Sequence, residues 1–236
     1  MISKRRKWVL ALAGVLSIAA GIALLLNREE GPFYQGKRLS EWVSIYRLEP
    51  DDDVSRQAIR SIGAEGYPYL IKWIDYERPA WRIKLSQLIP YQIVVNRAVA
   101  RLVYGDDSRA TAAASAFRAL GTNAAPTIPA LEAMMNNSKR PSAARLALFA
   151  LGYMGEPALP ALTNAFANPH QNLRYMIPVA LDLMAANASN CMSRCTSVLR
   201  EHLNDPDPMV SLYTTMCLRD ITHEPLTNAP TSALPR

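Results

Sequence analysis

The hydrophobic positions in the middle of the chain recur with the period of an α-helix. Ala112, Ala116 and Leu120 lie four residues apart and predict one apolar stripe along a first helix. A second stripe follows, formed by Ile128, Leu131 and Met135. Because neither helix can shield its own stripe from water, we predict that the two helices pack as a pair and stack on neighbouring pairs.

Glycine and proline mark equivalent places in three copies of this pattern. A glycine follows each first stripe, and a proline comes five residues later: Gly63 with Pro68, Gly121 with Pro126, and Gly152 with Pro157. The second and third copies are 31 residues apart. Glycine adopts the positive φ that commonly ends a helix, and proline is tolerated in the first helical turn. We therefore predict that each glycine ends a first helix and each proline begins a second one.

Weaker copies are predicted on the C-terminal side. Residues 172–181 and the apolar pair Val198 and Leu199 predict another helix pair, joined by a loop over residues 186–194. Residues 209–221 predict a single last helix. The end of the chain, residues 224–236, contains three prolines and is predicted to be a disordered tail.

The N-terminal flank of the repeats is less regular. Apolar residues spaced as on one helix face predict a cap helix within residues 31–50, with Ser40 as its N-cap. Residues 80–89 and 91–104 predict two helices separated by Pro90. This stretch fits the repeat least well, although it lies between two clear copies.

These residues resemble a known family. Arg-x-Ala-x-x-x-[Ile/Leu]-Gly followed by Pro-x-Leu resembles the short bacterial HEAT repeats that are related to phycobilisome-lyase repeats. Arg56 and Arg145 match the first position of this motif, whereas Ala114 replaces the arginine in the second copy. Residues 34–42 resemble the segment that opens many membrane-anchored bacterial HEAT-repeat proteins. The resemblance implies an all-α fold, an α-solenoid of about five helix pairs over residues 51–223, that serves as a binding or scaffolding surface.

The first 30 residues follow a different pattern, that of a membrane anchor. Four basic residues precede an uncharged run that begins at Trp8 and ends at Leu26; they are Lys4, Arg5, Arg6 and Lys7. A helix over residues 8–26 would be roughly 28 Å long, close to the thickness of a bilayer core. We predict a single transmembrane helix there. The alternative is a cleaved signal peptide with its cleavage site near residues 17–19.

The position of the positive charges predicts the orientation in the membrane. Basic residues gather before the apolar run, so the N-terminus is expected in the cytoplasm and the repeats outside it, in a bacterial periplasm. The first 30 residues supply half of the net charge of +6, so half of the positive charge belongs to the predicted anchor. The charge that remains on the repeats is too small to predict a nucleic-acid interface.

Candidate chemistry is sparse. Acidic clusters at residues 51–53, 106–107 and 205–207 stand where helices are predicted to begin, and we expect them to cap those helices. Outside the cytoplasm Cys191 and Cys195 could form a disulfide. Free thiols, or a zinc site shared with His202, are the other readings of these cysteines. No nucleotide-binding or hydrolase motif occurs.

The sequence thus predicts a non-catalytic scaffold, tethered to the membrane, that binds a protein or peptide without a cofactor. Neither a nucleic acid nor a small-molecule substrate is expected. The alternative, implied by the related lyase repeats, is a cofactor-handling or lyase-like enzyme on a HEAT-repeat scaffold. Second helices usually line the concave side of such stacks. We therefore expect the contacts within residues 67–76, 126–136 and 157–167.

Overall fold

The computed structural model describes residues 31–89, 106–168 and 171–223. The predicted anchor (residues 8–26), the predicted helix over residues 91–104 and the predicted tail (residues 224–236) lie outside these residues. Within them, all regular secondary structure is helical apart from one short hairpin. None of the helices described has the length and apolar character needed to cross a bilayer. The fold is therefore all-α, as predicted.

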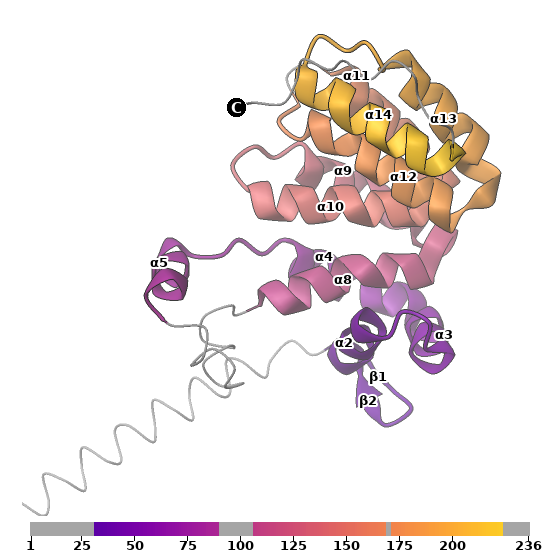
Figure 1. The fold of residues 1–236 in the computed structure, drawn as a ribbon. Coiled ribbons are helices and arrows are strands. Elements are labelled where there is room, and N and C mark those ends of the chain that lie inside the picture. The colour runs from indigo at the N-terminus through magenta and orange to yellow at the C-terminus, as the bar shows by residue number, and fades with distance from the viewer. Residues whose placement is uncertain (1–30, 90–105, 169–170, 224–236) are drawn as a thin grey trace, which may run out of the picture.

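The α-helices follow one another with short connections (Figure 1). Their bounds in chain order are α2 (Leu39–Leu48), α3 (Asp53–Ile62), α4 (Tyr67–Ile74), α5 (Ala80–Leu88), α8 (Asp107–Leu120), α9 (Ile128–Met135), α10 (Pro141–Met154), α11 (Leu159–Ala167), α12 (Ile177–Asn187), α13 (Met192–Glu201) and α14 (Pro208–Thr222). The predicted helix over residues 209–221 corresponds to α14, and Val198 and Leu199 lie on α13. The helix predicted over residues 172–181 matches α12 only in part, because α12 begins at Ile177, after the 3-10 helix over residues 174–176.

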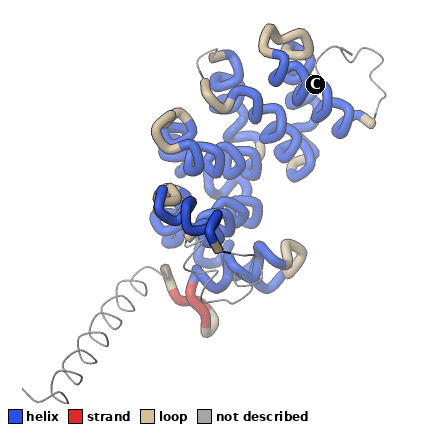
Figure 2. Tube along the Cα trace, turned by 60° about the vertical axis from the view of Figure 1, so that its left-hand side comes forward, coloured by secondary structure: helices blue, strands red, loops and turns tan. Residues whose placement is uncertain are grey.

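Four helices pack against each other in chain order and form the middle of the molecule. α8 packs on α10, α10 on α12, and α12 on α14, while α2, α3 and α4 pack on α8 (Figure 1). Figure 2 shows the stacked helices from another side. α11 packs against α10 and α12, and α13 against α12 and α14. The core between these helices contains many fully buried alanines, such as Ala113 and Ala116 of α8 and Ala147 of α10. Small side chains at these positions allow the helix backbones to approach closely.

The three repeat glycines do not all play the predicted role. Gly63 and Gly121 end α3 and α8 with φ of 51° and 55°, which confirms the prediction for these two. Gly152 instead lies inside α10, which continues to Met154 and is followed by Gly155 at φ 79°. A Cβ atom on Gly152 would be only 2.7 Å from the carbonyl oxygen of Ala180 on α12. Gly152 therefore serves close packing between helices.

The repeat prolines also differ from one another. Pro68 lies in the first turn of α4, as predicted. Pro126 and Pro157 lie in 3-10 helices, η2 (Gly121–Thr127) and η3 (Glu156–Ala158), that precede α9 and α11. Pro129 and Pro160 occupy the first turns of those helices instead. The N–H groups of a first helical turn have no intrahelical partner, so a proline costs no hydrogen bond there. For this reason α9 could begin at Pro126 or at Pro129, and α11 at Pro157 or at Pro160.

Similar 3-10 turns precede three other helices. They are η1 (Gly63–Gly66) before α4, η4 (Arg174–Met176) before α12, and η5 (Ser189–Cys191) before α13. The loop predicted over residues 186–194 is therefore mostly helical: α12 extends to Asn187 and α13 begins at Met192. Its Asn and Ser residues allow a tight turn without a long irregular segment.

The N-terminal part contains a hairpin that the sequence did not predict. β1 (Phe33–Tyr34) pairs with β2 (Lys37–Arg38) in antiparallel register, Phe33 opposite Arg38. The Nε1–H of Trp42 donates to the Tyr34 carbonyl at 2.9 Å and joins the hairpin to α2. The cap helix is confirmed, but it begins at Leu39, so that Ser40 is inside the helix and Arg38 is the N-cap. The Arg38 N–H donates to the Glu41 carboxylate at 3.1 Å.

Candidate functional site

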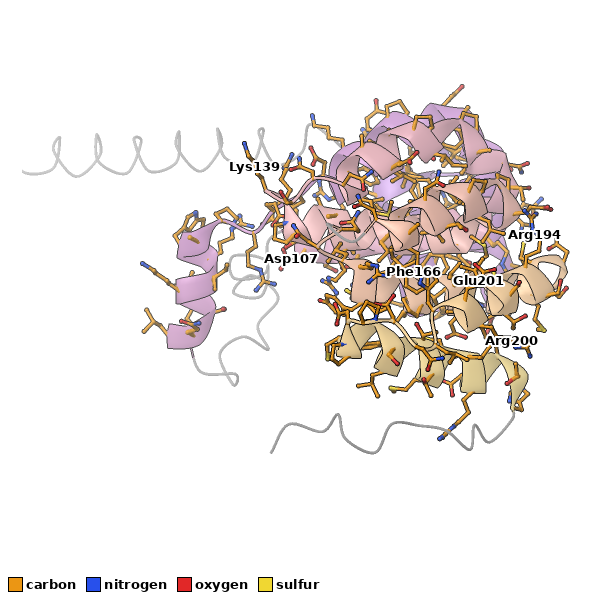
Figure 3. All side chains as sticks on the ribbon, turned by 90° about the horizontal axis from the view of Figure 1, so that it is seen from above. Asp107, Lys139, Phe166, Arg194, Arg200 and Glu201 are labelled. Atoms are coloured by element: carbon orange, nitrogen blue, oxygen red, sulfur yellow. The ribbon has the colours of Figure 1, made fainter. Side chains whose placement is uncertain are left out.

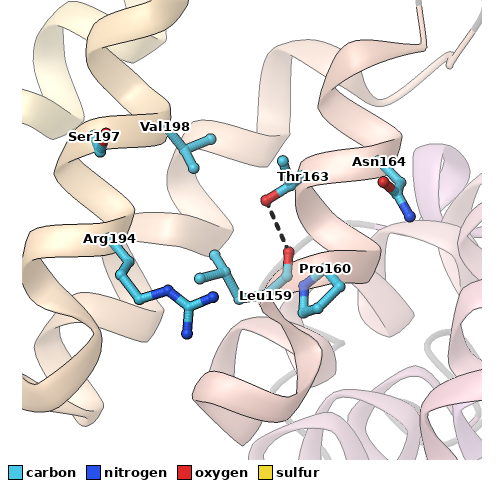
Figure 4. A pocket seen from close by; sticks show the side chains of 7 residues that line it. All are labelled: Leu159, Pro160, Thr163, Asn164, Arg194, Ser197 and Val198. Atoms are coloured by element: carbon cyan, nitrogen blue, oxygen red, sulfur yellow. Dashed lines mark hydrogen bonds between the residues drawn. The ribbon is translucent and has the colours of Figure 1, made fainter.

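A groove between α11 and α13 is the candidate binding site (Figure 4). Its volume is about 450 Å³. The lining side chains are Leu159, Pro160, Thr163 and Asn164 from α11, and Arg194, Ser197 and Val198 from α13. The residues on each helix are spaced by about one turn, so each helix presents one face to the groove.

The floor of the groove is apolar and its edges are polar. Leu159 is buried, Val198 is half-buried, and Pro160 is exposed. The Thr163 hydroxyl donates to the Leu159 carbonyl at 2.9 Å within α11 (Figure 4). Asn164 and Ser197 are exposed at the edges. This combination of apolar surface and a few polar groups is typical of ligand-binding sites.

One charged pair lies at the end of the groove. Arg194 of α13 pairs with Glu156 of η3, and both side chains are about half exposed, at 53% and 52%. Such an exposed pair contributes little to stability, about 0–1 kcal/mol. A carboxylate on a ligand can therefore replace that of Glu156 at small cost, and Arg194 offers it a bidentate donor.

The lining residues contain no carboxylate, imidazole or thiol. The groove itself therefore lacks a general acid or base and an activated nucleophile. In the described part of the chain, no group of three His, Cys, Asp or Glu residues is close enough together to hold a metal ion.

Only one of the three ranges predicted to make contacts, residues 157–167, lines the groove. Residues 157–167 supply four residues of the groove, whereas the other three come from α13, which the sequence did not single out. The sequence signal for α13 was its place as the second helix of a weak repeat copy. Three tryptophans lie in the described residues: Trp42 and Trp73 are buried in the core, whereas Trp81 of α5 is 53% exposed.

The three cysteines are free thiols and all are buried. Burial raises the pKa of Cys195 to about 12, with a smaller effect from the neighbouring Cys191. Burial also raises the pKa of Cys217 to about 12, and that of Cys191 above its ordinary value. His202 contacts other groups, since its ring stacks on Phe166 with centroids 3.8 Å apart.

These thiols give a testable prediction about their reactivity. A pKa of about 12 in place of 9.0 lowers the thiolate fraction of Cys195 and Cys217 about a thousandfold at pH 8. We expect Ellman's reagent to react slowly with the folded protein and to titrate all three cysteines after unfolding in guanidinium without reductant. Only one reactive thiol after unfolding would demonstrate a disulfide and contradict the structure.

The acidic clusters act in two ways. Asp52 and Asp207 cap α3 and α14, accepting from the N–H groups of Ser55 and Met209 at 2.9 Å, as predicted. Asp106 is the N-cap residue of α8, without a side-chain hydrogen bond. Asp205 was expected to cap a helix as well, and this prediction was wrong. Its side chain is turned inward, with 3% exposure, because it pairs with the partly buried Arg174.

Asp205 is the centre of a largely buried polar network between α11, η4 and the connection from α13 to α14. Both carboxylate oxygens accept from Arg174, one of them at 2.7 Å, and His202 Nδ1 lies 3.3 Å from Oδ2. Arg174 also donates through Nε to the Phe166 carbonyl at 2.8 Å. Burial acts to raise the pKa of Asp205, but the hydrogen bonds from Arg174, the Asp207 N–H and His202 outweigh it and lower the pKa.

Comparisons with known proteins identify no relative of this chain. No protein-family model matches it, and no curated protein and no solved structure shows significant similarity.

Proposed function

We propose that this chain is a membrane-tethered, extracytoplasmic scaffold of HEAT-like repeats that binds a protein or peptide in the groove between α11 and α13. The observation that carries the proposal is this groove, an apolar floor with polar edges and no catalytic group. In the proposed solenoid, α11 and α13 are second helices of consecutive pairs. The groove then lies between second helices, which usually line the concave side of such stacks.

Two features support the repeat interpretation. The pairs α8–α9, α10–α11 and α12–α13 follow one another in the chain, and their first helices pack in that order. A 3-10 turn precedes the second helix of each pair, and also α4. A recurrent turn and a recurrent packing order are the properties expected of repeats that bury their apolar stripes against one another.

The lining residues define the chemistry of the partner. Leu159, Pro160 and Val198 offer apolar contact, and Asn164 and Ser197 offer hydrogen bonds. Arg194 adds a cation that is already half exposed. A peptide segment with an apolar side chain beside a carboxylate can use the apolar contacts, the hydrogen bonds and the cation together. The anchor over residues 8–26 would hold this scaffold at the outer face of the cytoplasmic membrane.

Photo-crosslinking in living cells tests the proposed function. A photoreactive amino acid at Ser197, inside the groove, is expected to give a discrete crosslinked product. The same group at Met216, exposed on α14 and outside the groove, is expected to give none. Val198→Asp places a charge on the apolar floor and should reduce the product roughly tenfold, because one such contact contributes more than about 1.4 kcal/mol at the centre of an interface.

Met216→Asp is the matched control, because it introduces the same charge at an exposed apolar residue away from the groove. We expect it to leave the Ser197 crosslink unchanged, and both variants to keep the thermal unfolding transition of the parent. Equal crosslinking from the two positions, or a Ser197 product that Val198→Asp does not reduce, would show that the groove is not the binding site.

A further inference from the structure

Helix α5 exposes an apolar stripe that the other described helices do not cover. None of its residues is buried, and it stands apart from the other described helices (Figure 1, Figure 3). Trp81 is 53% and Leu88 78% exposed. With Leu85 they are spaced four and three residues apart, so the three side chains share one face of the helix.

Basic side chains accompany this stripe. Arg82 and Lys84 lie on either side of it in the helix, and the Arg82 guanidinium is 5.2 Å from the centre of the Trp81 ring. The sequence has no acidic residue between Glu77 and Asp106. A helix that combines tryptophan, leucine and basic residues without acidic ones is complementary to the anionic headgroup region of a bilayer.

The chain leading into α5 is fixed to the folded body. Arg140 pairs with Asp75 at 2.5 Å, and the Ala143 N–H donates to the Glu77 carboxylate at 2.9 Å. Arg78 pairs with Asp107 at the start of α8. These contacts with α8 and α10 hold residues 75–78 against the folded body and so fix the point from which α5 projects.

The point from which α5 projects lies near the place where the chain is predicted to leave the membrane anchor. Gly31 packs so close to Trp73, in the last turn of α4, that a Cβ on the glycine would be 3.5 Å from the indole ring. The anchor is predicted to end at Leu26, so the bilayer surface is at most about 18 Å of extended chain from Gly31. α5 begins at Ala80, at most about 25 Å of chain from Trp73. The stripe can therefore reach the same bilayer.

We propose that α5 lies on the surface of an anionic phospholipid bilayer, with Trp81, Leu85 and Leu88 in the interface and Lys84 at the lipid phosphates. This inference rests on the membrane anchor of the proposed function and adds a second contact with the same membrane. Two contacts fix the orientation of the helical body, whereas a single anchor leaves it free to rotate.

Fluorescence quenching by brominated lipids tests the proposal on the full chain. The protein is reconstituted into vesicles of phosphatidylglycerol and acyl-brominated phosphatidylcholine, and tryptophan emission is compared with that in unbrominated vesicles. Of the four tryptophans, Trp42 and Trp73 are buried in the core at 3% and 4% exposure. We expect Trp81→Phe to remove roughly half of the quenchable signal, since the remainder then comes from Trp8 at the membrane interface.

The possible outcomes distinguish failure of the proposal for α5 from failure of the anchor prediction. If the parent and Trp81→Phe are quenched equally, Trp81 is away from lipid and the proposal for α5 is wrong, while the Trp8 signal still supports the anchor. Coverage of the stripe by another protein or by another part of this chain would produce this result. If neither protein is quenched, the anchor prediction fails and the α5 proposal fails with it.

Matched charge reversals test the electrostatic part. Lys84→Glu on α5 should abolish most of the Trp81 component of quenching in vesicles that contain phosphatidylglycerol. Arg200→Glu, an exposed site on α13 on the other side of the molecule (Figure 3), should leave it unchanged. An equal effect of both variants would overturn the proposed contact between α5 and anionic lipid.

Discussion

Replacing Asp205 by alanine is expected to destabilise the protein by about 2–4 kcal/mol, because it leaves the largely buried side chain of Arg174 without its counter-ion. The Arg174 side chain is 14% exposed and donates two hydrogen bonds to the Asp205 carboxylate, which is 3% exposed. A domain of this size has a total stability of about 5–15 kcal/mol. Equilibrium unfolding in urea, followed by circular dichroism, measures the loss.

Asp207→Ala is the matched control. This aspartate is two residues away, is exposed, and only caps α14 through the Met209 N–H at 2.9 Å. Its removal should cost about 1 kcal/mol. Similar losses for the two variants would show that the network around Asp205 adds no more than a helix cap.

The pH dependence gives the same test a second readout. The pKa of Asp205 is lowered below 3.8 in the folded protein, so its contribution is complete at higher pH and is lost as the pH falls through the folded-state value. The stability difference between the parent and Asp205→Asn should therefore shrink below about pH 4. A difference that stays constant into acid would contradict the ionised pair.

The sequence predicted the helices of the fold because their apolar stripes are local. The stripe of Ala112, Ala116 and Leu120 lies on α8, and Gly121 ends that helix. The start of the second helices was predicted less well. Pro126 and Pro129 both suit a first turn, but Pro126 lies within the 3-10 helix η2, and the end of η2 at Thr127 decides where α9 begins. Such a turn has no pattern of its own in the sequence.

The groove and the Asp205 network were not predicted, because each joins residues that are distant in the chain. Arg194 lies 38 residues from its partner Glu156, and Asp205 lies 31 residues from Arg174. The second separation equals the repeat period, so pairing charges one repeat apart could have suggested the network. The groove had no such signal, because the spacing of α11 and α13 depends on the helices packed beneath them.

Gly152→Ala is expected to destabilise the protein by about 1–3 kcal/mol, although alanine is the better helix former. In an exposed helix the same change would stabilise by about 0.5–1 kcal/mol. Here the new Cβ would lie 2.7 Å from the carbonyl oxygen of Ala180 and 3.2 Å from its Cα, so α10 and α12 would have to separate. A valine at this position should cost more. Urea unfolding gives both the sign and the size of the effect.

Two further variants identify the cause of this effect. Gly66→Ala is the matched control, because its Cβ would meet only side-chain methyl groups of Leu39 and Ile62, at 3.1 and 3.2 Å. We expect a change of less than about 1 kcal/mol there, since side chains yield more readily than backbone. Adding Ala180→Gly should not rescue Gly152→Ala, because the obstacle is the backbone of residue 180. Stabilisation by Gly152→Ala alone would mean that helix propensity dominates and that α10 and α12 are not in backbone contact at this position.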